Sequence, residues 1–436
     1  MENILSKLLE ADNLVIIQGT KELREAFKSP DAIPALCNVL STSNSPEIRQ
    51  YAALLLRKRL SKQMQWSKLS PDVQNNIKQG ILPILINEKE KFVKNSVAQF
   101  VAVIAKHEIS KSNWPELLKL IQDLVTSSNE SEVELGLFTL SVLTDIALDI
   151  FSNNPGPGSA FLCSTFQSPN CMNPTLGYYT IMTMIHVVSL CESNPYLRNT
   201  FNETIPRVIE IIKYLATTDE EKASECMELF DEISEYAVPL LVPHIQAVIH
   251  LCLELAMNKN LGDTIRNKAL TLIGWITRIK KKAVIKHKLI KPIVDVVFAL
   301  MCEPPEDEDD EEYFVDDDDD STPTTNATQT LDVLALHLPP QKLITPVFEH
   351  VSAGLAGDNL YVKKASYLAL AMLAEGCADC IRTKCLKMFL ECVCRGITDP
   401  APVVRNAALF ALGQFSEHLQ VTRYETFFDS TASELL

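Results

Sequence analysis

The feature that most limits how this chain can fold is a pattern that recurs along almost its whole length. In the stretch from Asp399 to Glu417, a polar turn with two prolines precedes apolar residues at helical spacing. The arrangement recurs, and the positions equivalent to Arg405 are Arg49, Lys94, Glu134, Tyr178, Lys222, Arg266 and Lys364. These positions lie 40 to 45 residues apart, except for one step of 98 that holds two repeats and an insertion. A period of about 40–47 residues is typical of the helix pairs of HEAT or armadillo repeats.

This period predicts an all-α fold, an α-solenoid (superhelix) of about nine to ten HEAT repeats. A chain of 436 residues would ordinarily divide into several compact domains, whereas each helix pair of a solenoid packs only on its neighbours. An irregular all-helical protein is the alternative that the pattern leaves open. At the last clear repeat we expect Asp399 to cap the turn and Arg405 to pair with it across the turn.

The negative charge of the chain is concentrated in one short segment. The net charge is −16, twelve acids lie in residues 306–312 and 316–320, and the rest of the chain carries −4. Mutual repulsion and a lack of apolar residues predict an extended or disordered loop there. Such a loop either attracts basic partners or merely aids solubility, and its composition alone does not decide between the two. General binding of nucleic acid is disfavoured, because it needs a basic footprint.

The twelve cysteines and the N-terminus indicate a reducing compartment. Several cysteines, such as Cys226 and Cys252, lie in apolar helical runs, where free thiols act as small hydrophobic side chains, and the chain does not start with a signal-peptide pattern. The cluster from Cys377 to Cys394 holds one CxxC pair where zinc sites usually have two, so we expect no metal. Residues 175–191 are the best membrane candidate but fall short of the roughly 20 apolar residues of a span.

Enzyme chemistry is not expected. The sequence contains no phosphate-binding, zinc-protease or nucleophile-elbow motif, and its eight histidines are isolated, so we expect neither catalysis nor a cofactor. Residues 278–282 and 286–291 form one basic segment. No aromatic stacking platform accompanies this segment, which favours a solvated helix end over a nucleic-acid site.

The repeat pattern fails once inside the chain. Residues 152–175 carry no charge, show no helical period and are rich in Pro, Gly, Ser and Asn. This composition predicts an irregular loop or a segment foreign to the fold.

Four stretches of the chain resemble the importin-β (karyopherin-β) family of nuclear transport receptors. They are residues 32–37, 46–53, 331–342 and 399–420. Residues 20–86 look like the N-terminal, Ran-binding domain of that family. The resemblance covers most of 1–151 and 176–420 but neither 152–175 nor 421–436. Because members of the family are much longer, it implies that the chain is the N-terminal portion of such a receptor.

The resemblance also implies a function. Receptors of this family bind basic cargo such as histones or ribosomal proteins, contact the Phe-Gly repeats of nucleoporins, and release cargo when the small GTPase Ran binds in its GTP form. We therefore expect a monomer in the cytoplasm, the nucleus and the nuclear pore, with no direct nucleic-acid or membrane partner. A HEAT scaffold that bridges proteins without Ran is the alternative.

Two sets of partner-binding residues follow from the resemblance. An acidic loop midway along the solenoid contacts Ran or cargo in the family, and here it corresponds to Glu306, Asp307, Glu308, Asp309, Asp310, Glu311, Glu312, Asp316, Asp317, Asp318, Asp319 and Asp320. Ran also contacts the inner helices of the first repeats, which we expect at residues 32–40, 73–86 and 114–125. The polar residues expected to face Ran are Asp31, Asn38, Asp72, Asn75, Lys78 and Gln79.

The predicted division of the chain follows from these segments. It comprises N-terminal repeats (1–151), the irregular loop (152–175), central repeats (176–302), the acidic loop (303–327), further repeats (328–420) and a divergent tail (421–436).

Overall fold

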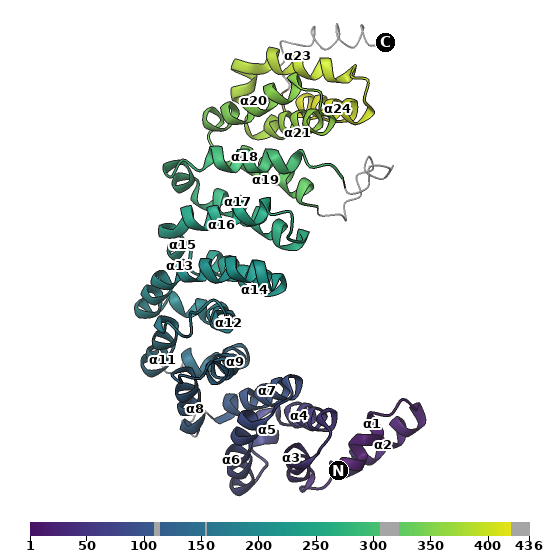
Figure 1. The fold of residues 1–436 in the computed structure, drawn as a ribbon, viewed down its shortest axis with the longest axis vertical. Helices are drawn as coiled ribbons and strands as arrows, with labels where there is room; N and C mark the ends of the chain where they lie inside the picture. Colours follow the sequence, from purple (N-terminus) through teal and green to yellow (C-terminus); the bar gives the residue numbers. More distant parts are fainter. Residues whose placement is uncertain (109–113, 153–154, 306–321, 420–436) are drawn as a thin grey trace. The chain divides into compact units, whose positions relative to one another are not determined.

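The computed structural model describes the chain except for residues 109–113, 153–154, 306–321 and 420–436 (Figure 1). In the described part the chain is built from successive helices, and the all-α HEAT solenoid predicted from the repeat is confirmed. The chain forms two compact units, residues 1–211 and residues 212–436.

The helices of the first unit follow one another through short connections. They are α1 (Glu2–Leu8), α2 (Asn13–Ala26), α3 (Ala32–Thr42), α4 (Pro46–Leu60), α5 (Gln63–Trp66), α6 (Pro71–Asn87), α7 (Lys91–Glu108), α8 (Pro115–Val125), α9 (Glu130–Ile146), α10 (Asp149–Ser152), α11 (Pro155–Gln167) and α12 (Gly177–Val187). The boundary between the units falls inside α13 (Pro195–Thr218).

The second unit continues the pattern. Its helices are α14 (Glu220–Tyr236), α15 (Val238–Leu241), α16 (Ile245–Met257), α17 (Asp263–Lys286), α18 (Ile290–Met301), α19 (Pro323–His337), α20 (Pro340–Ala356), α21 (Leu360–Gly376), α22 (Ala378–Cys380), α23 (Leu386–Ile397) and α24 (Pro402–His418).

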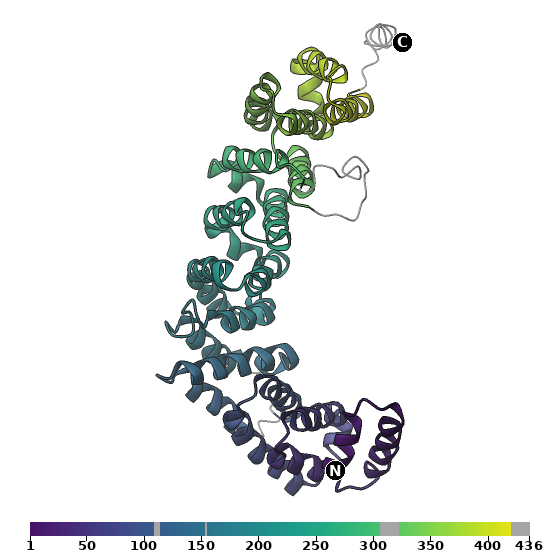
Figure 2. The ribbon, with the colours of Figure 1, turned by 45° about the vertical axis from the view of Figure 1, so that its right-hand side comes forward.

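Within each unit the helices form two rows. In residues 1–211 the second helices of successive pairs, α4, α7, α9 and α12, pack directly on one another (Figure 2), whereas the first helices, α3, α6 and α8, hardly touch each other. In residues 212–436 the second helices α17, α19, α21 and α24 are packed closely in the same way. A stack of helix pairs curves toward its more closely packed row. The second helices therefore line the concave side within each unit, and the first helices form an outer row.

In two of the second helices, an early arginine joins one helix pair to the next. Arg49 of α4 donates to the backbone carbonyl of Ser43 at 3.0 Å and, through two nitrogens, to the carboxylate of Glu88 in the next pair at 2.9 Å each. Hydrogen bonding from Arg49 lowers the pKa of Glu88 below its usual value, so this carboxylate stays charged. Arg266 of α17 likewise bonds Glu303 at 2.9 Å. At these two positions the basic residue of the repeat therefore links one helix pair to the next.

The turn of the last repeat is held by the two residues predicted to hold it. Asp399 caps the turn as predicted, because its Oδ1 accepts the N–H of Ala401 at 2.9 Å. Arg405 donates to the backbone carbonyls of Asp399 and Pro400, at 2.9 and 2.8 Å. The Asp399 carboxylate lies instead 3.5 Å from the amine of Lys363 in α21. Arg405 therefore pairs with Asp399 across the turn as predicted, through the backbone carbonyl, while the carboxylate of Asp399 faces the preceding helix.

The prediction of an irregular loop over residues 152–175 is wrong for the part that forms α11. Ser159, Leu162 and Phe166 recur at helical spacing and are buried, and Phe166 packs edge-to-face on Phe201 of α13 with ring centroids 5.6 Å apart. This helix is hard to predict from the sequence, because the segment has no charged residue and begins with prolines and glycines. Prolines in the first turn of a helix sacrifice no hydrogen bond, so the helix forms nonetheless.

Two predicted segments fall outside the described residues. They are the acidic residues from Glu306 to Asp320 and the divergent tail, 421–436.

Among the described residues, one stretch has the length and composition that a membrane span needs, Val238–Met257. It comprises α15, a 3₁₀ turn and α16, and more than half of it is buried inside the protein. A core helix of a helical stack has the same composition, so this stretch is weak evidence for a membrane segment.

Candidate functional site

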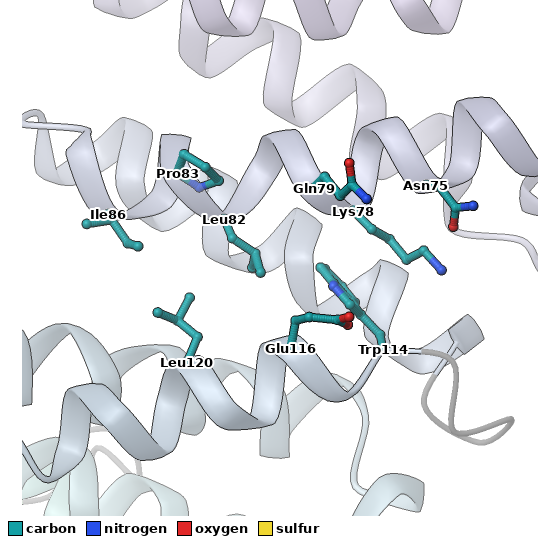
Figure 3. A pocket seen from close by; sticks show the side chains of 9 residues that line it. All are labelled: Asn75, Lys78, Gln79, Leu82, Pro83, Ile86, Trp114, Glu116 and Leu120. Carbon is teal, nitrogen blue, oxygen red and sulfur yellow. The ribbon is translucent and has the colours of Figure 1, made fainter.

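A groove lies between two neighbouring first helices of residues 1–211, α6 and α8 (Figure 3). We call it the outer groove, and its volume is about 430 Å³. It is lined by Asn75, Lys78, Gln79, Leu82, Pro83, Ile86, Trp114, Glu116 and Leu120. Because the first helices are spaced widely, this opening exists between them, whereas the second helices close the gap on the concave side.

One half of the outer groove is apolar. Leu82 of α6 and Leu120 of α8 point toward each other, with Ile86 beside them (Figure 3). The side chain of Ile86 is 43% exposed, whereas Trp114 at the other half is only 2% exposed. The groove therefore offers an accessible apolar slot next to a buried aromatic ring.

A buried ionic cluster supports the polar half of the outer groove. The amine of Lys78 donates to Oε2 of Glu108 at 2.8 Å, and Nε1 of Trp66 donates to Oε1 of the same carboxylate at 2.8 Å. Glu108 is 4% exposed, so its charge depends on these donors. Because the Lys78 charge is already neutralised inside the protein, the groove suits a neutral aromatic or aliphatic side chain better than an anion.

The structure brings together only some of the residues that were predicted to face Ran. Three of them line the outer groove: Asn75, Lys78 and Gln79. The other three are exposed but do not line it: Asp31, Asn38 and Asp72. Trp114 and Leu120 were missed by sequence reasoning because they belong to the next helix pair, and only packing places them opposite α6.

The assignment of residues 32–40, 73–86 and 114–125 as inner helices is wrong. These segments are α3, α6 and α8, which form the outer row. The connections before and after α3 are both short. The sequence therefore does not show whether α3 is the second helix of a pair with α2 or the first helix of a pair with α4. The apolar stripe of a helix shows which face is buried but not on which side of the stack the helix lies. A contact of the six polar residues with Ran stays an untested prediction.

A second groove lies on the concave row of residues 212–436, among α14, α17 and α19. We call it the inner groove, and its volume is about 380 Å³. It is lined by Asp231, Asp263, Thr264, Asn267, Lys268, Thr271 and Asn326. The amine of Lys268 donates to the carbonyl of Ser224 at 3.0 Å and to the carboxylate of Glu228 at 3.1 Å, so its charge is compensated.

Asp231 of α14 and Asp263 of α17 line the inner groove, and further carboxylates of α14 lie near Asp231. Burial raises the pKa of Asp231, and the charges of Glu228 and Glu232 add to the rise while Lys268 opposes it. Burial also raises the pKa of Glu232, with a contribution from Glu235. When neighbouring carboxylates raise each other's pKa, a cation bound between them stabilises their charged forms. The inner groove therefore favours basic groups.

The cysteines are free thiols, most of them buried. Burial raises the pKa of Cys37, Cys191 and Cys377 to about 12, so these thiols stay protonated. Within the described ranges, no group of three or more His, Cys, Asp or Glu side chains could hold a metal ion. The thiols thus pack as small apolar side chains.

The chain matches three protein families. Residues 19–87 match the family described as "Importin-beta N-terminal domain", residues 89–251 match "IPO5-like, TPR repeats", and residues 389–419 match "HEAT repeat". The second match includes residues 152–175, where the sequence analysis found no resemblance.

Two curated relatives match nearly the whole chain. Importin-4 of Mus musculus is 35% identical over 428 residues, and importin-4 of Homo sapiens is 36% identical over 430 residues. Each alignment covers 96% of this chain and 39% of the relative. The chain therefore spans well under half the length of the curated relatives it matches.

Solved structures of Kap121p share the fold. Kap121p matches with a TM-score of 0.80 at 20% identity, covering 100% of this chain and 42% of that chain. Kap121p bound to RanGTP matches with a TM-score of 0.76 at 20% identity, covering 96% and 40% of the two chains. Kap121p bound to Nup53p matches with a TM-score of 0.78 at 20% identity, covering 98% and 41%.

Proposed function

The chain belongs to the importin-β family of nuclear transport receptors, and from this premise we propose that it binds basic protein cargo and the GTP form of Ran during nuclear import. Two observations carry the proposal: a groove with carboxylates on the concave row of residues 212–436, and a partly apolar groove on the outer row of residues 1–211. Such surfaces offer area and charge for partners. The proposed location is the cytoplasm and the nucleus, including the pore.

We place the Ran-binding surface on the concave row of residues 1–211. In the family, the inner helices of the first repeats contact Ran, and here the inner helices are α4, α7 and α9. Exposed polar residues on this row include Lys58, Asn95 and Glu134. Kap121p, which has the same fold, has been solved bound to RanGTP, which supports Ran binding by a chain of this fold.

The purified chain is expected to bind GTP-locked Ran at least about tenfold more tightly than GDP-loaded Ran, a difference of about 1.4 kcal/mol. Binding isotherms with the two loaded forms measure this directly. Equal affinity for both forms would favour a scaffold that bridges proteins without regard to nucleotide. No binding to either form would contradict the proposal.

The proposed cargo surface is the inner groove and the carboxylates of α14. Glu228, Asp231, Glu232 and Glu235 lie on one helix of the concave row, and the pKa values of two of them are raised in part by the others. A basic segment of a histone or ribosomal protein relieves this repulsion, and association then falls as salt rises.

The proposed surface for nucleoporin Phe-Gly repeats is the outer groove. Its apolar half, formed by Leu82, Ile86 and Leu120, is open to solvent and of a size that admits an aromatic side chain. The solved complex of Kap121p with Nup53p is consistent with a pore-protein site on this fold. Shallow, separate grooves of this kind give weak contacts that break quickly, as transit through the pore requires.

Ile86→Glu is expected to weaken binding of a Phe-Gly peptide about tenfold, because a charge replaces part of the apolar area that the phenyl ring buries. Fluorescence anisotropy with a labelled peptide measures the change. The matched control is Met64→Glu, since Met64 is 61% exposed and lies outside the groove. An equal loss in both variants would assign the effect to general charge repulsion and not to the groove.

A further inference from the structure

An isolated group of cations lies at the C-terminal end of α17 and has no part in the grooves described above. It consists of Arg278, Lys280, Lys281, Lys282, Lys286 and Lys288. We call it the cationic end of α17. The chain has no acidic residue between Asp263 and Asp295, although its net charge is −16. This stretch is therefore locally positive in a chain whose net charge is negative.

These cations have no counter-charge in the described part of the protein. None of the six forms an ion pair or a side-chain hydrogen bond with a described residue, whereas the neighbouring Lys291 bonds Glu349 at 2.9 Å. Only Lys286 lies in the last turn of α17, so the helix dipole explains one of the six. Lys282 and Lys286 are four residues apart, on the same face of the helix in successive turns, and repel each other.

The backbone of this segment ends α17 in a capped turn. Lys280 has non-helical angles, φ −129° and ψ 35°, which breaks α17 just before its last turns. Lys288 has φ 57°, the left-handed conformation of a common C-terminal cap. The N–H groups of Lys288 and Leu289 donate to the carbonyls of Ile285 and Val284 at 3.1 and 3.0 Å, so this cap compensates the backbone. The six cations, by contrast, have no counter-charge among the described residues.

From these observations we infer that the cationic end of α17 binds an acidic segment of a partner protein. Five of the six cations are lysines, and Arg, the residue best suited to phosphate, is present once. No Phe, Tyr or Trp lies between 278 and 291 to stack on a base. The net charge of the chain also repels a long polyanion, whereas a short acidic peptide meets only the local positive field. The half-buried Ile279 and Ile285 between the cations add apolar contact for peptide side chains.

This site does not depend on the proposed binding of Ran or basic cargo, and it gives the receptor a second surface of opposite charge. It suits a partner that accompanies basic cargo and is itself acidic, because the two would then occupy different surfaces of residues 212–436.

The test uses the full chain, a labelled oligo-glutamate peptide and the triple variant Lys281→Gln, Lys282→Gln, Lys286→Gln. We expect the variant to bind the peptide about tenfold more weakly at low salt, with a flatter dependence on salt. The matched control is Lys342→Gln, Lys384→Gln, Lys387→Gln, which removes the same charge from other exposed positions and is expected to bind as the unaltered chain does. Thermal unfolding of both variants checks that the fold is intact.

Two outcomes overturn the inference. Equal peptide binding by the two triple variants would show that the cationic end of α17 is not the site. An oligothymidylate of the same charge that binds as tightly as the peptide, with the same loss in the variant, would show a surface for phosphate and not for acidic protein. Weaker binding of the oligothymidylate supports the inference.

Discussion

Replacing Arg266 by methionine is expected to lower the free energy of unfolding by about 3 kcal/mol. Arg266 is 7% exposed and donates to the carbonyl of Ala256 at 3.0 Å and to the carboxylate of Glu303 at 2.9 Å. Methionine fills much of the same volume but leaves the carbonyl without this donor and the carboxylate with only Lys259, which lies 3.3 Å away and is largely exposed. The loss therefore comes mainly from two polar groups left poorly paired.

Urea unfolding followed by circular dichroism measures this change, and hydrogen exchange shows whether it is confined to the pairs around α17. The matched control is Arg278→Met, which removes the same charge from an exposed position of the same helix and is expected to change stability by less than about 0.5 kcal/mol. If the two variants lose the same stability, the buried network does not stabilise the stack.

Gly376→Ala is expected to destabilise the second unit by about 3 kcal/mol. A Cβ atom at Gly376, the last residue of α21, would overlap the backbone of Ala335 and Leu336 in α19. Backbone atoms cannot rotate away as a side chain can, so α19 and α21 must move apart along the closely packed concave row. Overpacking of this kind typically costs about 1–3 kcal/mol. Because the neighbouring backbone is rigid, we expect a cost at the upper end of this range.

The control substitution is expected to change the free energy of unfolding in the opposite direction. Gly413→Ala in α24 places a methyl group in open space, where alanine favours the helix by up to about 1 kcal/mol. Thermal unfolding of the two variants therefore separates close helix packing from a general effect of removing glycine. Stabilisation by both variants would contradict the close approach of α19 and α21.

The sequence predicted most helices because apolar residues at helical spacing mark the buried face of each one. The apolar pattern between Asp399 and Glu417, for example, forms α24 directly after the predicted turn. The helix α11 escaped prediction because it has no charged residue to mark an exposed face. Its burial depends on neighbours such as Phe201, which lies more than thirty residues away in the sequence.

The candidate sites were less accessible to sequence reasoning. Asn75, Lys78 and Gln79 were placed correctly on one helix, but the opposite wall of the outer groove comes from α8. The row with the closer spacing between helix pairs is the concave one. The amphipathic pattern of a single helix carries no information about this spacing. The acid-rich composition of α14 was visible in the sequence, yet its position beside Lys268 and Asp263 follows from the stacking of α14 on α17.

Because α3, α6 and α8 hardly contact one another, residues 1–211 can bend most easily by a motion that changes the spacing between these helices. Fanning these helices apart uncovers little apolar surface, and burial stabilises by only about 25 cal/mol for each Å². The concave row keeps its contacts during such a motion and acts as the hinge line. Because α6 and α8 form the two walls of the outer groove, its width changes with the elastic strain of the unit. A ligand that contacts both walls of the groove therefore opposes this motion and stiffens the unit.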